Sequence, residues 1–432
     1  MVRLIYNLLW PIGLLFFLPR YLVKMFRRGG YRESFGQRLA FYEPEVARRR
    51  LAHPGPTWIH AVSVGEIAIA LKFAQRLRQL EPQLLCVLTT TTTTGFAFAR
   101  GQVPDWIEVM YMPVDFWPIM RRAFRTVQPK RIVLVEGEVW PNLMARAAKS
   151  EIPVALINAR LSPRSERRFV RFRNFVAPVF QRLDLVCVPT LEDVRKWRAL
   201  GVLRETIHHT GSIKYDPAEM QKPPEDKEIR LFHLCPTDPE NPVLLGGSTH
   251  SGEEEILARV FRRLREKFPT LTLAIAPRHV ERVDQIQRKL EAMSFVVRRR
   301  SQSESHAQDR PDCVLLDTTG ELSLWYRIAS IAFVGKSLTA HGGQNPVEPI
   351  VAGVPVMFGP NMENFEPLAS QLVAHHGAVL VRNESDLEQT AGNLLGNPDA
   401  RRRLIASAEE VLAQHRGATR RTAELVASLK AG

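Results

Sequence analysis

Short apolar runs rich in β-branched residues alternate with longer amphipathic segments along most of the chain. In the first half the runs WIHAVSV, LLCVLTTTTT, IEVMYMPV, RIVLVE, PVALINA and DLVCVPT predict strands, with the threonines 89–94 forming a strand end and a turn. Between these runs, residues 67–80, 116–127, 141–150 and 166–183 predict helices. Strands and helices that alternate at this spacing indicate a parallel sheet covered by helices on both faces.

The alternation stops at residues 216–242, where DPAEMQKPPEDKEIRLFHLCPTDPENP is rich in proline and charge and is typical of a linker. It begins again with the runs PVLLGGS, LTLAIAP, FVVRR, CVLLD, IAFVG, VPVMFG and GAVLV, and helices are expected at 386–395 and 401–415. A chain of 432 residues is also too long for one ordinary core. We therefore predict an α/β fold of two doubly wound, Rossmann-like domains, residues 31–215 and 243–432, that face a central cleft.

The first residues of the chain have the composition of a membrane anchor. Residues 4–19, LIYNLLWPIGLLFFLP, hold no charged side chain, and as a helix they would reach about 24 Å, somewhat less than a ~30 Å hydrocarbon core. Residues 1–50 hold ten Lys and Arg side chains, in a chain whose net charge is +14. We expect residues 1–30 to be an anchor that spans the membrane or lies in its plane, with the basic flank on the cytoplasmic side. The alternatives are a buried helix and a cleaved signal peptide, for which no small-x-small site follows.

The overall composition is that of a globular protein, with 45% hydrophobic and 24% charged residues. Four scattered cysteines without a CxxC pair argue against a disulfide framework or a structural zinc site and suit a reducing compartment. The basic charge would attract nucleic acid or an anionic membrane, but no nucleic-acid-binding module is recognisable, so we expect no nucleic-acid partner.

Acidic side chains follow two of the predicted strands, at the edge where open α/β sheets bind their ligands. A strand that ends at Val64 and a turn at Gly65 place Glu66 at the start of a helix. There it is either an acid stabilised by the helix dipole or a general base. Glu136 and Glu138 follow RIVLV; such a pair could bind a metal ion, but no His or Asp accompanies it, and we expect no metal site.

The segment LINARLSPRSERRFVRFR holds six arginines within residues 160–173, interleaved with phenylalanines. A solvated helix face explains such a charge run, but the mixture also suits a basic surface that rests on an anionic lipid interface. The side chains expected to contact an acceptor or the membrane are Arg160, Arg164, Arg167 and Arg168.

In the second half, GGSTHSGEEE follows a strand. Ser248 and Thr249 are expected to cap a helix that begins near Glu253, with backbone amides that can hold a phosphate. His250 is either catalytic or a structural histidine of the loop. Arg278, at the end of AIAPRH, suits a two-pronged contact with phosphate.

Two further loops complete the set of strand-end motifs. LLDTTGEL, residues 315–322, is expected to turn tightly into a helix. In GGQNPVEP, Gly342 and Gly343 would let the backbone approach a ligand closely, and Asn345 could cap a helix whose first turn holds the proline. A capped helix alone leaves Glu348 without a role, whereas a carboxylate there could accept hydrogen bonds from the two hydroxyls of a ribose. The segment therefore predicts a nucleotide-binding site.

Eight motifs occur in order behind the apolar N-terminus: HAVSVGE, VEGEVWPN, NARLS, GSIKYD, GGSTHSGEEE, APRH, DTTGEL and GGQNPVEP. In this order they resemble bacterial 3-deoxy-D-manno-octulosonic acid (Kdo) transferases, which are glycosyltransferases of the GT-B fold. The resemblance implies transfer of Kdo from CMP-Kdo to a lipid A precursor, with inversion at the anomeric carbon and with neither metal nor cofactor. It also implies an enzyme on the cytoplasmic face of the bacterial inner membrane.

The resemblance assigns roles to residues whose motifs match. Glu66 is similar to the general base, and Glu136 and Lys214 to residues that stabilise the transition state. The residues that match the family's CMP contacts are Pro277, Arg278, Thr319, Gly320, Glu321, Asn345, Pro346, Val347 and Glu348, and further donor-loop contacts are expected at Ser248, Thr249, His250, Gly342 and Gly343. The chain departs from the pattern at Gln344, where many members have His, and at Thr319, where an apolar residue is expected.

Other classes of protein predict different behaviour. A membrane-associated GT-B enzyme that uses a UDP-sugar would be stabilised by UDP rather than CMP. A non-catalytic binder of anionic lipid or nucleic acid would tolerate the loss of Glu66. A dinucleotide oxidoreductase is disfavoured because no GxGxxG follows a predicted strand.

Overall fold

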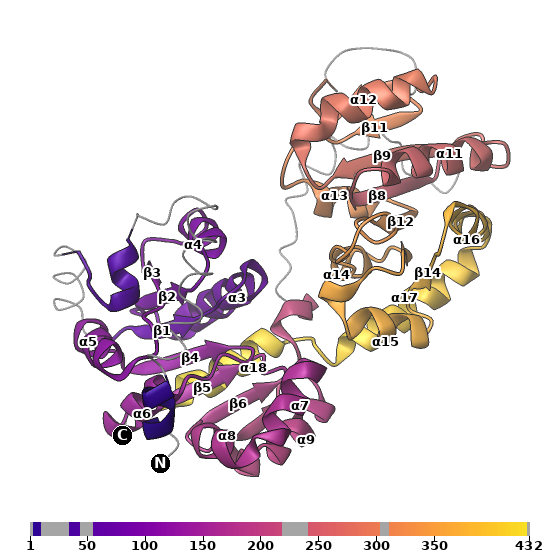
Figure 1. The fold of residues 1–432 in the computed structure, drawn as a ribbon. Helices are drawn as coiled ribbons and strands as arrows, with labels where there is room; N and C mark the ends of the chain where they lie inside the picture. The colour runs from indigo at the N-terminus through magenta and orange to yellow at the C-terminus, as the bar shows by residue number, and fades with distance from the viewer. Residues whose placement is uncertain (1–2, 10–33, 44–54, 218–240, 303–310, 430–432) are drawn as a thin grey trace. The chain divides into compact units, whose positions relative to one another are not determined.

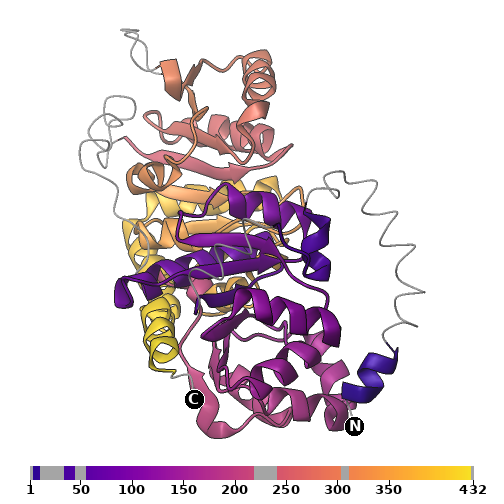
Figure 2. The ribbon, with the colours of Figure 1, turned by 90° about the vertical axis from the view of Figure 1, so that its left-hand side faces the viewer.

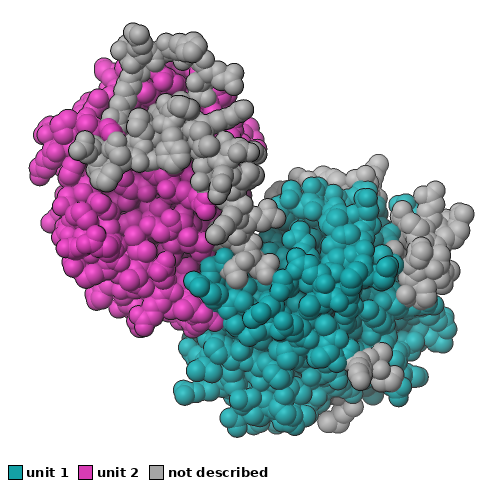
Figure 3. All heavy atoms as spheres, turned by 180° about the vertical axis from the view of Figure 1, so that it is seen from behind, with its two compact units in different colours: residues 1–219, 415–432 teal, residues 220–414 magenta. Residues whose placement is uncertain are grey.

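The structure is a computed structural model, and it describes residues 3–9, 34–43, 55–217, 241–302 and 311–429. The chain forms two compact units, Met1–Glu219 with His415–Gly432, and Met220–Gln414 (Figure 3). Most of the expected anchor and linker lie outside the described residues. Within the ranges given above, no helix is both long and apolar enough to cross a membrane.

The first unit is built on a seven-stranded, fully parallel sheet with the strand order β3-β2-β1-β4-β5-β6-β7 (Figure 1). Its strands are β1 (Thr57–His60), β2 (Cys86–Thr90), β3 (Ile107–Tyr111), β4 (Arg131–Val135), β5 (Val154–Ile157), β6 (Leu185–Val188) and β7 (Ile207–His209). Its helices are α3 (Val64–Leu80), α4 (Thr93–Arg100), α5 (Trp117–Val127), α6 (Pro141–Lys149), α7 (Pro163–Arg171), α8 (Arg173–Phe180), α9 (Leu191–Ala199) and α18 (Ala418–Ser428).

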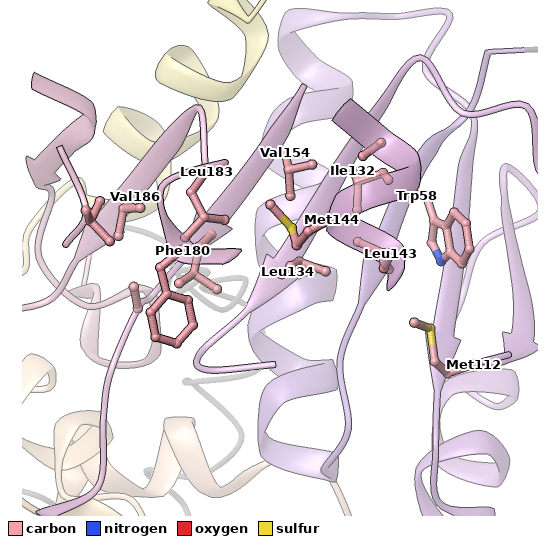
Figure 4. Close-up of a cluster of buried hydrophobic side chains, with 14 of the residues drawn as sticks. Trp58, Met112, Ile132, Leu134, Leu143, Met144, Val154, Phe180, Leu183 and Val186 are labelled. Atoms are coloured by element: carbon pink, nitrogen blue, oxygen red, sulfur yellow. The ribbon is translucent and has the colours of Figure 1, made fainter. Parts of the chain in front are cut away.

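Side chains of alternate residues fill two separate cores on the two faces of this sheet, because successive residues of a strand point to opposite sides. Trp58, Ile132 and Leu134 belong to the core under α5, α6 and α8, which Figure 4 shows with Met144 and other labelled side chains. Ile59, Val133 and Val135 belong to the opposite core, under α3 and α18. The continuous apolar runs of the sequence are therefore strands buried on both faces.

The last helix belongs to the first unit, so the expectation that residues 243–432 form one domain is wrong for residues 415–432. Helix α18, yellow in Figure 1, packs against α3, and its Ala423 and Val426 lie in the same core as Phe73 of α3. The Asp216 carboxylate accepts hydrogen bonds of 2.8 Å from the backbone N–H groups of Gly417 and Thr419. The apolar face of α18 is thus buried by a sheet that the chain completed some 200 residues earlier.

The second unit contains another seven-stranded parallel sheet, with the order β10-β11-β9-β8-β12-β13-β14. Its strands are β8 (Val243–Thr249), β9 (Thr272–Pro277), β10 (Val297–Arg299), β11 (Cys313–Leu315), β12 (Ile331–Val334), β13 (Val356–Phe358) and β14 (Val379–Leu380). Its helices are α11 (Glu253–Arg265), α12 (Val283–Ala292), α13 (Leu322–Ile328), α14 (Val347–Val351), α15 (Leu368–Ala374), α16 (Glu384–Gly396) and α17 (Pro398–Ala413).

The predicted alternation of strands and helices is confirmed in both units. Several details differ. The strand β7 was not expected, the helices α4, α9, α12, α15 and α18 were not named by the sequence analysis, and the helix predicted at 166–183 is two helices that meet at Phe172. The strand order reverses between β1 and β4 in the first sheet and between β8 and β12 in the second, where β10 and β11 are also exchanged. Ligands of open α/β sheets bind at the carboxyl ends of the strands beside such a reversal.

Candidate active site

Glu66 lies in the first turn of α3, and its carboxylate is held by backbone N–H groups. Its oxygens accept hydrogen bonds from Val62 N (3.0 Å) and Ser63 N (3.3 Å), while the Ser63 hydroxyl accepts one from Glu66 N (3.2 Å). This capping box begins the helix at Val64, so the expected strand to Val64 and turn at Gly65 are wrong, because β1 already ends at His60. The oriented carboxylate keeps unused lone pairs that can accept a proton.

Glu136 and Glu138 lie in the turn that follows β4, the strand that pairs with β1. Glu136 has a left-handed backbone (φ 62°), which is uncommon outside glycine and recurs at functional sites. Burial raises the pKa of Glu136, the charge of Glu66 raises it further, and Arg160 and Lys214 lower it. Burial likewise raises the pKa of Glu138, and the charges of Glu66 and Glu136 add to this rise.

Lys214 extends from a single 3₁₀ turn, Ile213–Tyr215, that follows β7. Burial lowers the pKa of Lys214, and the nearby charge of Glu136 opposes that effect. Glu136 therefore interacts electrostatically with Glu66, Glu138, Lys214 and Arg160, although these five residues come from four separate segments. The structure brings together the three residues predicted to be catalytic.

Asn158, which the sequence analysis did not select, positions the loop that carries Lys214. It follows β5 with a left-handed backbone (φ 49°), and its buried Oδ1 accepts hydrogen bonds from Ser212 Oγ (3.2 Å) and Ile213 N (3.1 Å). His415 Nδ1 accepts a third hydrogen bond, from Ser212 N (3.2 Å). Asn is the side chain that most readily tolerates this backbone, which was the available signal in NARLS.

The arginine-rich segment divides into two parts. Arg160 lies in the loop after β5, where its charge acts on Glu136 and Lys214. Arg164, Arg167 and Arg168 are exposed on α7. Arg160 therefore belongs to the charged cluster around Glu136.

In the second unit, a single buried carboxylate ties two strand-end loops together. Glu253, the first residue of α11, is fully buried and accepts hydrogen bonds from the N–H groups of His250 and Lys336 (2.8 Å each) and of Ser337 and Leu338 (3.0 Å each). His250 follows β8 and Lys336 follows β12, and these two strands lie at the reversal of this sheet. Sequence reasoning treated Glu253 only as the start of a helix.

The expectation that Ser248 and Thr249 cap α11 is wrong. The N-cap is Gly252, which has φ 94° and no side chain to bond. The Thr249 hydroxyl instead donates to the buried Glu254 carboxylate (3.0 Å), which also pairs with Arg282 through two contacts of 3.0 and 3.2 Å. Burial raises the pKa of Glu254 and Arg282 lowers it.

The remaining predicted CMP contacts lie in loops at the same edge of this sheet, after β9, β11 and β12. Pro277 is buried at the end of β9, while the side chain of Arg278 is exposed and its N–H donates to Thr249 O (3.0 Å). After β11, Thr319 and Gly320 are exposed, and nothing lies within 4 Å of a Cβ placed on Gly320.

The Glu321 carboxylate, by contrast, already has partners: it accepts from Thr318 Oγ1 (2.7 Å) and pairs with Arg300 (3.2 Å). In the segment after β12, Asn345 Oδ1 accepts from Val347 N (3.0 Å), and Asn345 Nδ2 donates to Glu348 Oε1 (2.9 Å). Val347 opens α14.

The N-cap of α14 is Pro346, so Asn345, the predicted cap, lies one residue before the observed N-cap, and the proline lies just outside the first turn. Gly342 and Gly343 have positive φ angles and are buried. A Cβ on Gly342 would lie 2.6 Å from Asn364 Nδ2, and one on Gly343 would lie 2.5 Å from Met362 Sδ. At Gly342 and Gly343 the backbone therefore closely approaches side chains of the protein itself, where the sequence analysis expected a ligand.

Metal ligands and thiols add no further cluster. Across the described residues, no group of three or more His, Cys, Asp and Glu side chains is placed to hold a metal ion. Cys86, Cys187 and Cys313 are buried thiols that form no disulfide bond within the described residues.

Comparisons with known proteins agree with this fold and these motifs. The family model described as 3-deoxy-D-manno-octulosonic-acid transferase (kdotransferase) matches residues 33–217. The 3-deoxy-D-manno-octulosonic acid transferase of Haemophilus influenzae is 33% identical over 92% of this chain and 91% of its own length. The enzyme of the same name from Bordetella pertussis is also 33% identical, over 92% of each chain. The UDP-GlcNAc 2-epimerase of Neisseria meningitidis bound to UDP-GlcNAc shares the fold, with a TM-score of 0.58 and 13% identity over 87% of this chain and 100% of that one.

Two Rossmann-like units, each built on a seven-stranded parallel sheet, define a protein of the GT-B-like class. Within that class, 33% identity over nearly the whole chain is decisive. The chain belongs to the 3-deoxy-D-manno-octulosonic acid transferase family, and it is a glycosyltransferase.

Proposed function

We propose that this enzyme transfers Kdo from CMP-Kdo to the lipid A precursor, with inversion, without a metal ion and with Glu66 as the general base. The observation that carries the proposal is that Glu66 and Glu136 come after β1 and β4, the strands at the reversal of the first sheet, and that the charges of Glu66 and Lys214 both act on Glu136. Family membership supports the transferred sugar. The acceptor, the stereochemistry and the residue roles are our inference.

In the proposed reaction a hydroxyl oxygen of the acceptor attacks the anomeric carbon of Kdo. The bond between that carbon and the phosphate oxygen breaks, its electron pair leaves with CMP, and the hydroxyl proton passes to Glu66. The backbone N–H groups of Val62 and Ser63 fix the direction of the Glu66 carboxylate. A positioned base of this kind contributes roughly 10²–10⁴-fold to the rate.

Glu136 and Lys214 are proposed to stabilise the charges of the transition state. Positive charge develops at the anomeric carbon, and an ionised Glu136 stabilises it electrostatically. The Lys214 ammonium suits the carboxylate that Kdo carries next to that carbon. Arg160 supports this role of Glu136, because its positive charge favours the ionised form of the carboxylate.

The second unit is proposed to bind the CMP portion of the donor. Arg278 is exposed beside Thr249 and can contact phosphate, and Glu348 is oriented by Asn345 so that its carboxylate can accept from ribose hydroxyls. The loops that hold these residues lie at the edge of the sheet where ligands of this fold bind. A UDP-sugar is the alternative donor.

The first unit is proposed to rest on the anionic cytoplasmic face of the inner membrane. The helix of residues 3–9 attaches to α6 through its polar side chains, since Arg3 Nε (3.1 Å) and Asn7 Nδ2 (2.9 Å) donate to Asn142 Oδ1 (Figures 1 and 2). Its apolar side chains, including Leu4 and Leu8, are about two-thirds exposed. Apolar side chains are also exposed on α7 and α8, among the arginines. Such a mixture favours a lipid interface.

A mass-spectrometric transfer assay tests the proposal. Purified protein in detergent is incubated with lipid A precursor, freshly generated CMP-Kdo and a chelator, beside the variants Glu66→Gln and Glu205→Gln. Wild type and Glu205→Gln, which alters an exposed acid far along the chain, should add whole Kdo units, and Glu66→Gln should add almost none. Full activity of Glu66→Gln would refute the base assignment. No product with intact CMP-Kdo would refute the donor, and thermal protection by UDP but not CMP would favour the alternative.

A further inference from the structure

Lys336 occupies a special place in the second unit, although no sequence motif pointed to it. It follows β12, the strand that pairs with β8 at the reversal of the sheet. Its backbone is left-handed (φ 55°), a conformation that costs a non-glycine residue free energy. Its side chain is partly buried. Local structure alone does not explain a lysine with a strained backbone at the edge of the sheet where a ligand is expected to bind.

The backbone of Lys336 is fixed from both sides. Its N–H donates to Glu253 Oε2 (2.8 Å), and its carbonyl accepts from Gly343 N (3.0 Å). The same Glu253 oxygen accepts from His250 N (2.8 Å). Next to Lys336, a Cβ on Gly335 would lie 2.5 Å from Ser248 O, so the two loops touch backbone to backbone. Glu253 therefore fixes the backbone positions of Lys336 and His250 relative to each other.

The side chains of this pair lie next to further basic groups. Lys336 Nζ lies 3.5 Å from the position that a Cβ on Gly342 would occupy. The charge of Lys336 and that of Arg282 lower the pKa of His250, after burial, and Glu253 opposes them. The ring of His279 lies 5.6 Å from that of His250.

Neither side chain of the pair is neutralised within the described ranges. No carboxylate among those residues forms an ion pair with the Lys336 ammonium, and the buried His250 Nε2 has no hydrogen-bond partner there. Two carboxylates lie close to this pair and have partners of their own. Glu253 accepts hydrogen bonds from four backbone N–H groups, and Glu363 accepts one from Gly342 N (2.7 Å) and contacts His341 Nδ1 (2.9 Å). The two side chains can therefore bind an anion without first breaking an interaction.

We propose that Lys336 binds the phosphate of the nucleotide donor, with a second hydrogen bond from His250 Nε2. This inference rests on the proposed function, whose donor contains one phosphodiester. When the bond from phosphate to the anomeric carbon breaks, the electron pair stays on the phosphate oxygen and the group gains a negative charge. A fixed ammonium then stabilises the leaving CMP more than the bound donor, which lowers the barrier.

Calorimetric binding of CMP and of cytidine, which lacks the phosphate, separates this role from a structural one. Lys336→Met keeps the side-chain length and removes the charge, and Lys336→Arg restores it. Lys267→Met, at an exposed position of the same unit, is the control. Lys336→Met should weaken CMP binding about 10- to 100-fold and leave cytidine binding unchanged, while Lys336→Arg and Lys267→Met keep most of the CMP affinity.

Two results would overturn the inference in distinguishable ways. If wild type binds CMP and Lys336→Met binds it equally well, Lys336 does not hold the phosphate, and the proposed function is untouched. An equal loss of CMP and cytidine binding would indicate a structural defect and would also contradict the inference. If wild type binds neither CMP nor cytidine, the proposed donor itself is wrong.

Discussion

The carboxylates of Glu66 and Glu136 follow neighbouring parallel strands, and the charge of Glu66 raises the pKa of Glu136. Their surroundings differ. Glu66 is oriented by two backbone N–H groups at a helix N-terminus, whereas burial raises the pKa of Glu136, and the charges of Arg160 and Lys214 lower it. Two carboxylates in such different environments are suited to different tasks, one to take up a proton and one to stabilise charge.

Replacing Glu136 by Gln should stabilise the fold at neutral pH while abolishing transfer. The pKa of Glu136 is raised above its ordinary value of 4.5, so the folded protein binds this proton more tightly than the unfolded chain. Ionisation of Glu136 therefore lowers the free energy of unfolding. This destabilisation is absent below about pH 4 and grows as the pH rises through the folded-state pKa. The Tm difference between Glu136→Gln and wild type should therefore increase from pH 4 to pH 7. A difference that shrinks over this range would contradict the assignment, and Glu205→Gln should show none.

Removing the acceptor oxygen of Asn158 should disturb Lys214 without touching the donor site. Asn158→Gly keeps the left-handed backbone free of strain but leaves Ile213 N–H unpaired, at a cost of about 1–3 kcal/mol. We expect a lower Tm and a clearly lower kcat, with an unchanged KM for CMP-Kdo. Ser212→Ala, which removes only the hydroxyl donor, should have a smaller effect. An Asn158→Gly enzyme with normal kcat would show that the Lys214 loop needs no such support.

Breaking the pair of Glu254 and Arg282 should destabilise the second unit in a pH-dependent way. Arg282→Met leaves the buried Glu254 carboxylate unpaired, which costs about 3–5 kcal/mol near neutral pH. Because Arg282 lowers the pKa of Glu254, its loss raises that pKa further, so the destabilisation should increase as the pH rises above about 4.5. The readout is the thermal transition that CMP shifts upward. The double variant with Glu254→Gln should recover most of the loss, and a double variant as unstable as the single one would point to another role for Arg282.

Polar replacements at Phe172, between α7 and α8, and at Phe175 of α8 should weaken binding to anionic vesicles. The side chains of Phe172 and Phe175 are about half exposed, so Ser at both positions removes apolar surface at little cost to the fold. Cosedimentation with vesicles that contain phosphatidylglycerol should fall several-fold, and CMP binding should stay the same. Leu80→Ser, at the end of α3, is the matched control. Vesicle binding that is unchanged in the double variant would leave the N-terminal segment as the sole membrane contact.

Local pattern accounts for most of the fold and for the main acidic residues of the site. The apolar runs predict nearly every strand because a strand buried on both faces needs apolar side chains throughout, and β7 was missed because its three residues, IHH, are not apolar as a whole. Glu66, Glu136 and Lys214 could be selected by their positions near strand ends and by their motifs.

The run of three glutamates Glu253–Glu255 shows where local pattern stops being informative. In the sequence they are equivalent acids in the first turn of a helix. In the structure Glu253 binds four backbone N–H groups, Glu254 pairs with Arg282, and Glu255 contacts Lys289 on the surface. The partners that distinguish them, Leu338, Arg282 and Lys289, lie 28 to 85 residues away in the chain, so local pattern does not separate the three acids.

The sequence by itself determined two parallel sheets, the strand ends that carry the chemistry and the family. Those features depend on side-chain periodicity and on residues within one turn or strand. The tertiary structure alone decided that α18 completes the first unit, that Asn158 supports Lys214, and that Lys336 stands beside His250. Each of these depends on contacts between segments distant in the chain, which form only when the sheets bring strand ends together.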